Sequence, residues 1–401
     1  MNIISNYEQR KFWILVIIVA ISGFSQGMLM PLISVIFETD GVSSFLNGLN
    51  ATGLYIGTLL ISPFIEQPLR KYGYKPIILI GGGLVFVSLF LFPFWQSATF
   101  WFILRMLVGI GDHALHFSTQ TWITSDTNNG NLGKKMSIYG LSFSVGFAVG
   151  PLFVNLLEIS EALPFIISSV LCLLAWSLVF FVKNEHPEAL KGDATSTGWN
   201  RYKFAFKYAW IAFLPPFVYG FLESSIHSLF PVYALRLDFE VATVSVMLAA
   251  FSVGAIVTQL PFGILGDKIG RSNVIIGGLT SGTILFFICS QFEQSALIVT
   301  TIFALAGMSV GSLFSLGITY MADLTPKELL PTGNLLCGIF FSLGSLSGPT
   351  FGGLYLQVAQ GVSFLLLIAC VLGVTLCANL FYKNKILVLL LHHTLLENID
   401  F

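Results

Sequence analysis

Long apolar runs recur along the whole of this chain. A helix needs about 20 mainly apolar residues to cross the hydrocarbon core of a bilayer, and each run is long enough to supply one. The sequence therefore predicts an all-α membrane protein with twelve transmembrane helices. The runs lie at 12–36, 43–65, 76–96, 98–123, 136–158, 162–182, 206–235, 241–265, 273–292, 296–322, 331–356 and 361–382.

The composition agrees with a chain that is surrounded mainly by membrane lipid. Hydrophobic residues make up 55% of it and charged residues only 10%, whereas soluble proteins carry about 25% charged residues. The net charge of −1, together with the lack of a basic arm, predicts no nucleic-acid partner. The five cysteines lie in apolar runs without a C-x-x-C pair, and no Walker-type motif occurs. We therefore expect neither a metal site nor a cofactor.

Lysine and arginine are distributed between the runs in a way that predicts the orientation. If the N-terminus is cytoplasmic and each helix crosses once, seventeen of the nineteen fall in cytoplasmic segments. Arg236 falls outside, and Arg105 lies within a helix. Because positive charge is retained on the cytoplasmic side, we expect a multi-pass protein of the inner (plasma) membrane with both termini in the cytoplasm.

The two halves of the chain repeat each other. Like residues recur 197 positions apart, which indicates duplication of a six-helix unit and two pseudo-symmetric six-helix bundles, a plan common in secondary transporters. A stretch rich in charge, 183–205, is typical of a solvated linker. We expect a bundle at 1–182, a cytoplasmic linker at 183–205, a bundle at 206–382 and a cytoplasmic tail at 383–401. The matching residues are Gly23 with Gly220, Gln26 with Glu223, Gly57 with Gly254, Gly73 with Gly270, and Asp126 with Asp323.

A charged loop of the second half carries a motif. It reads GILGDKIGR, from Gly263 to Arg271. We expect Gly263 to let two helices approach closely, and Asp267 to pair with Arg271 or to accept bonds from the start of a neighbouring helix. With Gly270, these residues resemble the G-x-L-x-D-R/K-x-G-R signature of the major facilitator superfamily, whose loop helps to gate the cytoplasmic side. The resemblance covers nearly the whole chain and implies a carrier of small solutes.

The matching loop of the first half departs from this signature. It reads EQPLRKYGYK, with Arg70 in place of the acid and Glu66 in place of the first glycine, and it keeps Lys71, Gly73 and Lys75. We therefore expect that the first-half gate does not use charge pairs centred on an aspartate.

Three other segments resemble the same family. Helix four begins RMLVGIG at Arg105, similar to an R-x-x-x-G signature that is linked to proton coupling in the family. Helix five carries GFAVGP, ending at Pro151, similar to a motif of drug/proton antiporters, although such residues also serve packing and kinks in any membrane bundle. Helix seven, from Gly220 to Leu235, resembles bacterial carriers of the YfkF and YcaD type.

Helix four carries ionisable residues along one stripe. A charge in the hydrocarbon region costs about 2.5–3.5 kcal/mol even on the mildest scales, so each one needs a reason. Arg105, Asp112 and His116 lie within about 20° of one line along the helix, with His113 near its edge. In the family, helices one, four, seven and ten line the central cavity, which implies that the stripe faces a water-filled space for the substrate.

Helix seven presents a second polar face. Tyr219, Glu223 and His227 follow one another four residues apart, and Gln26 on helix one is the repeat partner of Glu223. A carboxylate taken out of water holds its proton toward neutral pH, and histidine titrates at about 6.5. We expect Glu223 and Asp112 to take up and release protons, with His116 and His227 as relays.

Each of these residues also has a structural alternative. Asp112 could pair with His116, and Glu223 with His227, as fixed bonds one turn apart. Arg105 could be a surface arginine whose side chain snorkels toward the outer interface.

Together these features predict a monomeric secondary transporter that moves a small-molecule substrate by alternating access. We expect the transport to be coupled to protons and the protein to work as an exporter. The sequence holds no nucleophile–base or metal cluster, so we do not expect an enzyme. Two alternatives stay open: an uncoupled facilitator or sugar-type importer and, from another class, a membrane receptor or enzyme.

Overall fold

The computed structural model describes residues 2–125, 132–186, 199–326, 329–359 and 361–397. Nearly all of them are helical, and this part of the chain contains no strand. Apolar runs form helices in lipid because a helix satisfies its backbone N–H and C=O groups internally. The elements are α1 (Asn2–Thr39), α2 (Ser44–Ile61), α3 (Glu66–Tyr72), α4 (Tyr74–Leu91), η1 (Phe92–Phe94), α5 (Ala98–Ser125), α6 (Leu132–Val149), η2 (Gly150–Glu158), α7 (Ala162–Ser177), η3 (Leu178–Phe181), α8 (Trp199–Ala209), η4 (Trp210–Phe213), α9 (Leu214–Arg236), α10 (Val241–Ile269), α11 (Arg271–Cys289), α12 (Ala296–Val310), α13 (Leu313–Leu324), α14 (Leu330–Val358) and α15 (Phe364–Glu397).

Eleven helical segments of the described residues are long and apolar enough to cross a membrane. The remaining predicted run, 43–65, forms α2, in which Asn47 and Asn50 lower the hydropathy. Both side chains are buried, and their amides donate to the backbone oxygens of Ser34 (3.0 Å) and Ala98 (2.7 Å). These amide N–H groups are therefore satisfied inside the protein instead of facing lipid. The predicted all-α membrane fold is confirmed.

The chain divides into two compact units. The first holds all of the first six predicted helices, and it also contains one end each of α9, α10 and α14. The expected linker, 183–205, lies for the most part outside the described residues. The first unit comprises Met1–Ser196, Ser224–Val253 and Leu346–Gln360, and the second comprises Thr197–Glu223, Gly254–Ser345 and Gly361–Phe401.

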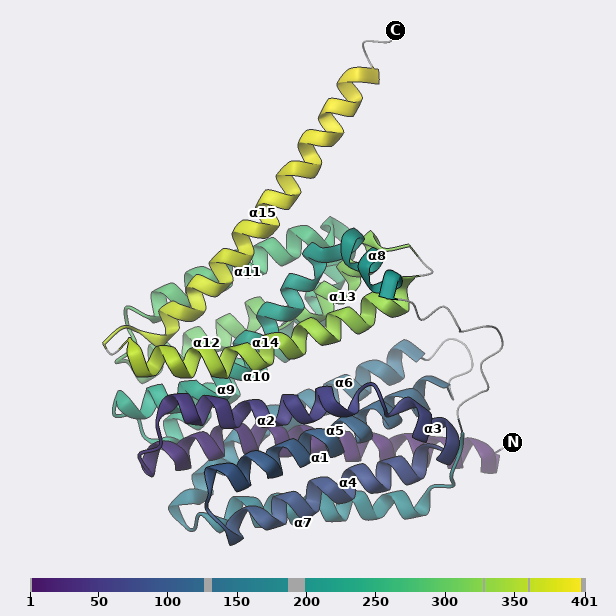
Figure 1. The fold of residues 1–401 in the computed structure, drawn as a ribbon, viewed down its shortest axis with the longest axis vertical. Coiled ribbons are helices and arrows are strands. Elements are labelled where there is room, and N and C mark those ends of the chain that lie inside the picture. Colours follow the sequence, from purple (N-terminus) through teal and green to yellow (C-terminus); the bar gives the residue numbers. More distant parts are fainter. Residues whose placement is uncertain (1, 126–131, 187–198, 327–328, 360, 398–401) are drawn as a thin grey trace. The chain divides into compact units, whose positions relative to one another are not determined.

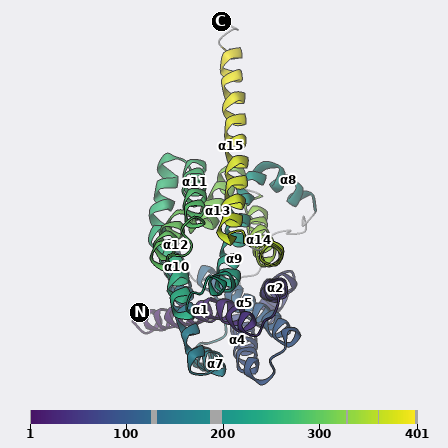
Figure 2. The ribbon, with the colours of Figure 1, turned by 90° about the vertical axis from the view of Figure 1, so that its left-hand side faces the viewer.

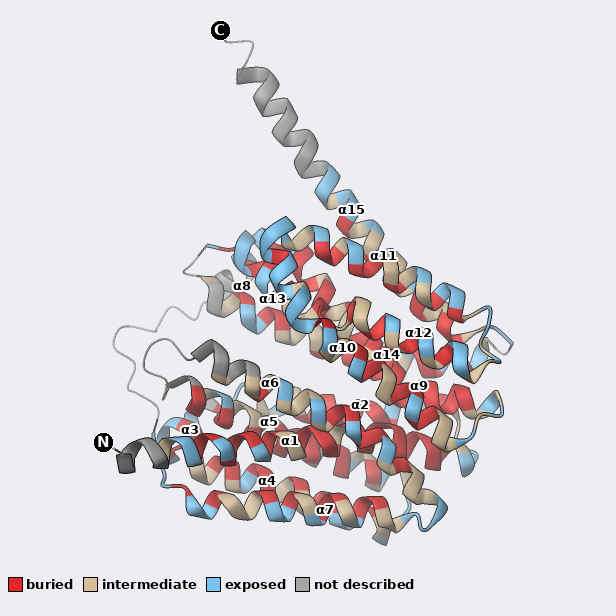
Figure 3. Cartoon of the chain, turned by 180° about the vertical axis from the view of Figure 1, so that it is seen from behind, coloured by how far each residue is buried: buried red, intermediate tan, exposed pale blue. Residues whose placement is uncertain are grey.

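Within the first unit, α1 packs against α6 and α7, and α5 packs against α2 and α4 (Figures 1 and 2). Glycines permit these approaches. A Cβ on Gly23 would lie 2.3 Å from the carbonyl oxygen of Phe143, and one on Gly109 would lie 2.0 Å from that of Leu54. Small residues of this kind bring helix backbones together in membranes. Figure 3 shows the buried residues that run along α1 as a result.

The second unit repeats one of these approaches. A Cβ on Gly220 would lie 2.2 Å from the carbonyl oxygen of Phe341, much as Gly23 faces Phe143. The two glycines are 197 positions apart and their partners 198, so the duplication in the sequence is present in the packing. In the same unit α15 packs on α11 and continues to Glu397, into the segment expected to be a tail.

Candidate functional site

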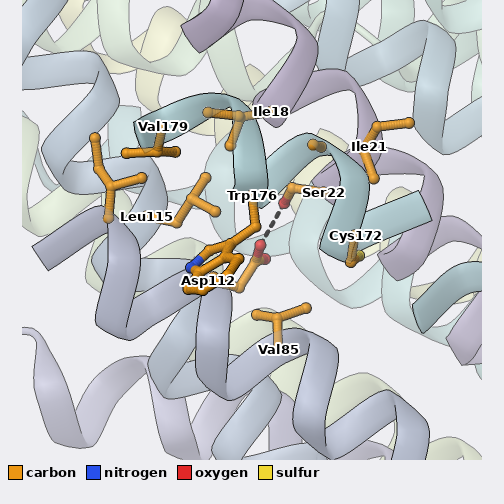
Figure 4. A pocket seen from close by; sticks show the side chains of 12 residues that line it. Ile18, Ile21, Ser22, Val85, Asp112, Leu115, Cys172, Trp176 and Val179 are labelled. Carbon is orange, nitrogen blue, oxygen red and sulfur yellow. Dashed lines mark hydrogen bonds between the residues drawn. The ribbon is translucent and has the colours of Figure 1, made fainter. Parts of the chain in front are cut away.

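Asp112 lies midway along α5, inside the first unit (Figure 4). One carboxylate oxygen accepts a hydrogen bond from Ser22 Oγ, and the other accepts one from Gln26 Nε2. Both donors lie one turn apart on α1, and both are neutral. Among the ion pairs of the described residues, this buried acid has no lysine or arginine partner. The protein therefore offers Asp112 hydrogen bonds without a compensating cation.

His116 extends these contacts from α5 to α6. Its Nε2 lies 2.9 Å from Ser22 Oγ and 3.7 Å from Asp112 Oδ1. Its Nδ1 lies 2.9 Å from the hydroxyl of Tyr139, which in turn is 3.2 Å from Thr119 Oγ1. The expected pair of Asp112 and His116 is thus bridged by a serine hydroxyl.

A pocket opens beside Asp112 between helices of the first unit (Figure 4). The sequence predicted that this stripe of α5 faces a central cavity. Asp112 lines this pocket, where Ser22 and Gln26 hold its carboxylate against α1, and the central cavity stays a prediction. Apart from Ser22, Asp112 and Cys172, the wall is mainly apolar. It includes Ile18 of α1, Ile78 and Val85 of α4, Leu115 of α5 and Trp176 of α7.

Arg105 is buried, with 2% of its surface exposed, which rules out a snorkelling surface arginine. Its Nη2 donates long hydrogen bonds to the carbonyl oxygens of Leu29 (3.4 Å) and Met30 (3.5 Å) on α1. Its Nη1 has no hydrogen-bond partner within the described part of the chain. His113, at the edge of the stripe, contacts Ser62 Oγ through Nε2 at 3.1 Å. The predicted stripe is therefore divided among three separate sets of partners.

The second acid, Glu223, lies on α9. The hydroxyl of Tyr219 donates to Glu223 Oε1 at 3.3 Å, and both residues belong to the second unit. His227, one turn further on, is buried in the first unit, where its ring centroid lies 4.7 Å from that of Phe147. Neither ring nitrogen of His227 has a hydrogen-bond partner among the described residues. The expected bond between Glu223 and His227 is therefore not formed.

The loop between α10 and α11 contains the predicted charge pair and a third member. Arg271 donates to Asp267 Oδ1 at 3.0 Å, and it also donates to Asp323 Oδ1 at the end of α13. Its Nη1 also donates to the carbonyl oxygen of Thr319 at 3.2 Å. Gly270 precedes Arg271 with φ 90°, a conformation that residues with a Cβ rarely adopt. One arginine thus connects α10, α11 and α13.

The glycine that allows a close approach in this loop is not the one that was expected. A Cβ on Gly263 would meet nothing within 4 Å, whereas one on Gly266 would lie 3.2 Å from Leu316 Cδ2 of α13. Both glycines lie on α10, but only Gly266 faces α13. The motif supplies the residue types, and the rotation of the helix decides which glycine is needed.

The matching loop of the first half obtains its acid from elsewhere in the chain. Glu185, which follows η3, accepts bonds from Lys11 Nζ (3.0 and 3.1 Å) and from Trp122 Nε1 (2.7 Å). The Trp122 ring stacks on Tyr74 at 5.1 Å between centroids, and the backbone N–H of Tyr74 donates to the carbonyl oxygen of Glu185. Gly73 has φ 85° at the turn before α4. The acid of this cluster thus comes from Glu185, and a first-half gate that works without aspartate-centred charge pairs stays a prediction.

A third polar cluster joins the ends of several helices in the first unit, on the side away from the Lys11 cluster. Arg236 Nε donates to Glu38 Oε1 at 2.7 Å, and Nη2 donates to Glu38 Oε2 at 3.2 Å and to Ser44 Oγ at 2.5 Å. Nη1 donates to the carbonyl oxygen of Leu356 at 3.3 Å. A single arginine therefore links the ends of α9, α1, α2 and α14.

Sequence reasoning missed Ser22, Tyr139 and Glu185 as members of these clusters. Ser22 lies four residues before Gln26, so the helical period could have identified it. Glu185 and Lys11 are 174 positions apart, and no local pattern connects them. Among the described residues, no three His, Cys, Asp or Glu side chains come together as a metal site would require.

Comparisons with known proteins place this architecture in a family. The sequence profile of the Major Facilitator Superfamily matches residues 15–244 and 216–387. The chain is 52% identical over 375 residues to the uncharacterized MFS-type transporter YfkF of Bacillus subtilis (strain 168), over 93% of this chain and 96% of that protein. It is 26% identical over 379 residues to the proton-coupled antiporter flippase LtaA of Staphylococcus aureus (strain MSSA476), over 90% and 91%. It is 25% identical over 348 residues to multidrug resistance protein 1 of Bacillus subtilis (strain 168), over 84% and 87%.

Solved structures share the fold. The nucleoside transporter NupG matches with a TM-score of 0.79 at 13% identity, over 92% of this chain and 98% of NupG. A bacterial homologue of the human lysosomal transporter Spinster matches with a TM-score of 0.71 at 14% identity, over 96% and 95%. At such low identity the likeness concerns the fold alone. With a family profile that spans both halves and a relative at 52% identity, this chain belongs to the major facilitator superfamily.

Proposed function

We propose that this protein is a secondary transporter that couples the movement of a small solute to protons and works as an exporter. One observation carries the coupling: Asp112, which is buried, and Glu223, which is partly buried, have hydroxyl, amide and imidazole contacts in the described part of the chain, and no lysine or arginine partner among its ion pairs. An ionised carboxylate without a cation is costly inside a membrane. Such a group favours a bound proton in one state of the cycle and loses it when water enters.

Glu223 is the main proton-responsive group in this proposal. Glu223 accepts a hydrogen bond of 3.3 Å from the hydroxyl of Tyr219, whereas donors on α1 bond both oxygens of Asp112. A carboxylate with fewer fixed donors changes its protonation with less rearrangement around it. His227, with unbonded ring nitrogens one turn away, is suited to accept a hydrogen bond when α9 moves.

The names of two relatives support export by antiport. One relative at 26% identity is a proton-coupled antiporter flippase, and another at 25% is a multidrug resistance protein. For this chain, protons would then enter the cell as the solute leaves. The bias of lysine and arginine supports a plasma-membrane location with both termini in the cytoplasm.

Two charge clusters suit opposite gates of an alternating-access cycle. Arg236 with Glu38 lies on the side that the charge bias makes external. Asp267 with Arg271 and Asp323 lies on the side that it makes cytoplasmic. In such a cycle each gate opens in one state and closes in the other, so each cluster should break once in every turnover.

The proposal is tested by flux measurements on purified protein in liposomes. A thermal-shift screen of small solutes first selects a binder, which then serves as the radiolabelled probe. Glu223→Gln keeps the size of the side chain and removes its charge. We expect this variant to lose solute movement driven by a proton gradient while it keeps part of the solute exchange at equal pH.

Asp112→Asn is the matched variant on α5. If it alone shows the uncoupled behaviour, Asp112 carries the proton and Glu223 does not. If both variants still concentrate solute at the expense of a proton gradient, neither acid couples transport. A wild-type protein that moves solute down its gradient without any response to protons would establish an uncoupled facilitator.

A further inference from the structure

A chain of hydrogen-bonding groups crosses three helices of the first unit. It runs from Asp112 Oδ1 through Ser22 Oγ to His116 Nε2, and from His116 Nδ1 to the hydroxyl of Tyr139. Gln26 Nε2 bonds the other carboxylate oxygen, and the pocket wall beyond Asp112 is mainly apolar. Within the described residues, the hydrogen-bonded path for a proton on Asp112 Oδ1 therefore leads through Ser22.

We propose that this series of hydrogen bonds is a proton relay with two protonation states, and that Ser22 and Tyr139 are its positioning residues. Through them, the protonation of Asp112 controls the hydrogen bond between α5 and α6. The inference rests on the proton coupling proposed above and adds a defined route for one of the protons.

The first protonation state belongs to ionised Asp112, which can only accept hydrogen bonds. Ser22 O–H then donates to the carboxylate, and its oxygen accepts from His116 Nε2–H. The ring proton of neutral histidine is thereby placed on Nε2, so Nδ1 is an acceptor. Tyr139 O–H donates to it across 2.9 Å. The hydroxyls of Ser22 and Tyr139 and both ring nitrogens of His116 then all have hydrogen-bond partners.

The second protonation state follows when one proton enters at His116 Nδ1. The proton on Nε2 passes to Ser22 Oγ, and the former hydroxyl proton of Ser22 passes to Asp112 Oδ1. Asp112 is then a neutral acid that donates to Ser22, Ser22 donates to Nε2, and Nδ1–H donates to Tyr139. The hydroxyl of Tyr139 turns to the backbone oxygen of His116, 3.4 Å away. One proton has been added, and again every group of the chain is satisfied.

The surroundings direct the proton along this chain. On α7, Cys172 Sγ lies 3.0 Å from Ser25 Oγ of α1 instead of joining the chain. On α5, His113 contacts Ser62, and Arg105 bonds carbonyl oxygens of α1 about two turns away. The wall from α4 consists of apolar side chains and glycine. Tyr139 and Thr119 lie toward the end of the bundle that the charge bias makes cytoplasmic, so the relay connects Asp112 to that side.

The first test is an infrared titration of the purified protein, which needs no solute. The carboxyl signal of Asp112 is identified by its loss in Asp112→Asn. Ser22→Ala removes a donor from the ionised carboxylate, so we expect the pH midpoint of this signal to rise by about one unit. Ser22→Thr keeps the hydroxyl and should titrate like the wild type. The matched control is Ser34→Ala, because the hydroxyl of Ser34 on the same helix donates to the backbone oxygen of Met30.

The second test is the rate of proton uptake after a pH jump, followed by the same infrared signal. Tyr139→Phe keeps the ring and removes the hydroxyl that connects Nδ1 to α6. We expect uptake to slow by about tenfold or more, since a positioned proton donor contributes at least that much. Equal midpoints for Ser22→Ala and Ser34→Ala, or an unchanged rate for Tyr139→Phe, would overturn the relay. If the liposomes show no proton-coupled flux while the midpoint of Ser22→Ala and the uptake rate of Tyr139→Phe change as expected, the coupling is refuted and the relay is supported.

Discussion

The two halves of the chain carry the same loop 197 positions apart and stabilise it in different ways. In the second half, Arg271 forms ion pairs, one of them with Asp267. In the first half, its counterpart Tyr74 stacks on Trp122, and Arg70 stands at the position of Asp267. Both loops turn at a glycine with positive φ. The backbone of the loop has thus been kept while the interactions of its side chains have changed.

The difference in burial indicates what each loop does. Lys11, the cation of the first-half cluster, is 2% exposed and its partner Glu185 is 35% exposed, whereas Asp267 is 67% exposed. Loss of one partner from a buried pair costs about 3–5 kcal/mol, while an exposed pair is worth about 0–1 kcal/mol. The first-half cluster is therefore a fixed part of its bundle, and the second-half pairs are weak enough to open and close during transport.

The largest effect should be the loss of stability in Glu185→Gln. This change removes one carboxylate partner of the buried Lys11 and leaves Glu8 as a partner. We expect a loss of about 2 kcal/mol, less than for a fully buried pair since Glu185 is partly exposed. The measurement is the thermal unfolding midpoint in detergent. Lys11→Met combined with Glu185→Gln removes the buried cation together with its partner Glu185 and should recover most of the loss. A double variant no more stable than Glu185→Gln would contradict a buried charge pair.

Asp267→Asn should have the next largest effect, on transport and not on stability. A pair that forms in one state of the cycle shifts the balance between states, so we expect about a fivefold lower rate of solute exchange in liposomes. The thermal unfolding midpoint should stay near that of the wild type. Arg70→Ala is the matched change in the first-half loop and should leave the rate nearly unchanged. If Arg70→Ala is the more damaging of the two, the comparison of the loops is wrong.

Ionic strength should give the smallest effect. An increase from 0.1 M to 1 M salt shortens the screening length from about 10 Å to about 3 Å. The exposed pairs of Arg271 weaken, and we expect the exchange rate of the wild type to change by about twofold. Asp267→Asn should respond less, because one of these pairs is already absent. A response of the same size in both proteins would show that the salt acts elsewhere.

The fold could be predicted to a large extent because membrane helices follow from local composition. The run that forms α2 was identified even though its buried asparagines lower its hydropathy. The site could be predicted only in part. Asp112 and His116 were placed on one face correctly, but the partners that decide their chemistry come from α1 and α6. Periodicity within one helix contains no information about the neighbouring helix.

By itself, the sequence determined the membrane helices, their duplication and the pairing of Asp267 with Arg271, because each depends on residues close together in the chain or on a repeated pattern. Only the tertiary structure decided that Glu185 neutralises Lys11 and that Ser22 bridges Asp112 and His116. These contacts join residues 174 and 90 positions apart. They depend on how each helix is rotated in its bundle, which packing sets at glycines such as Gly23 and no local pattern encodes.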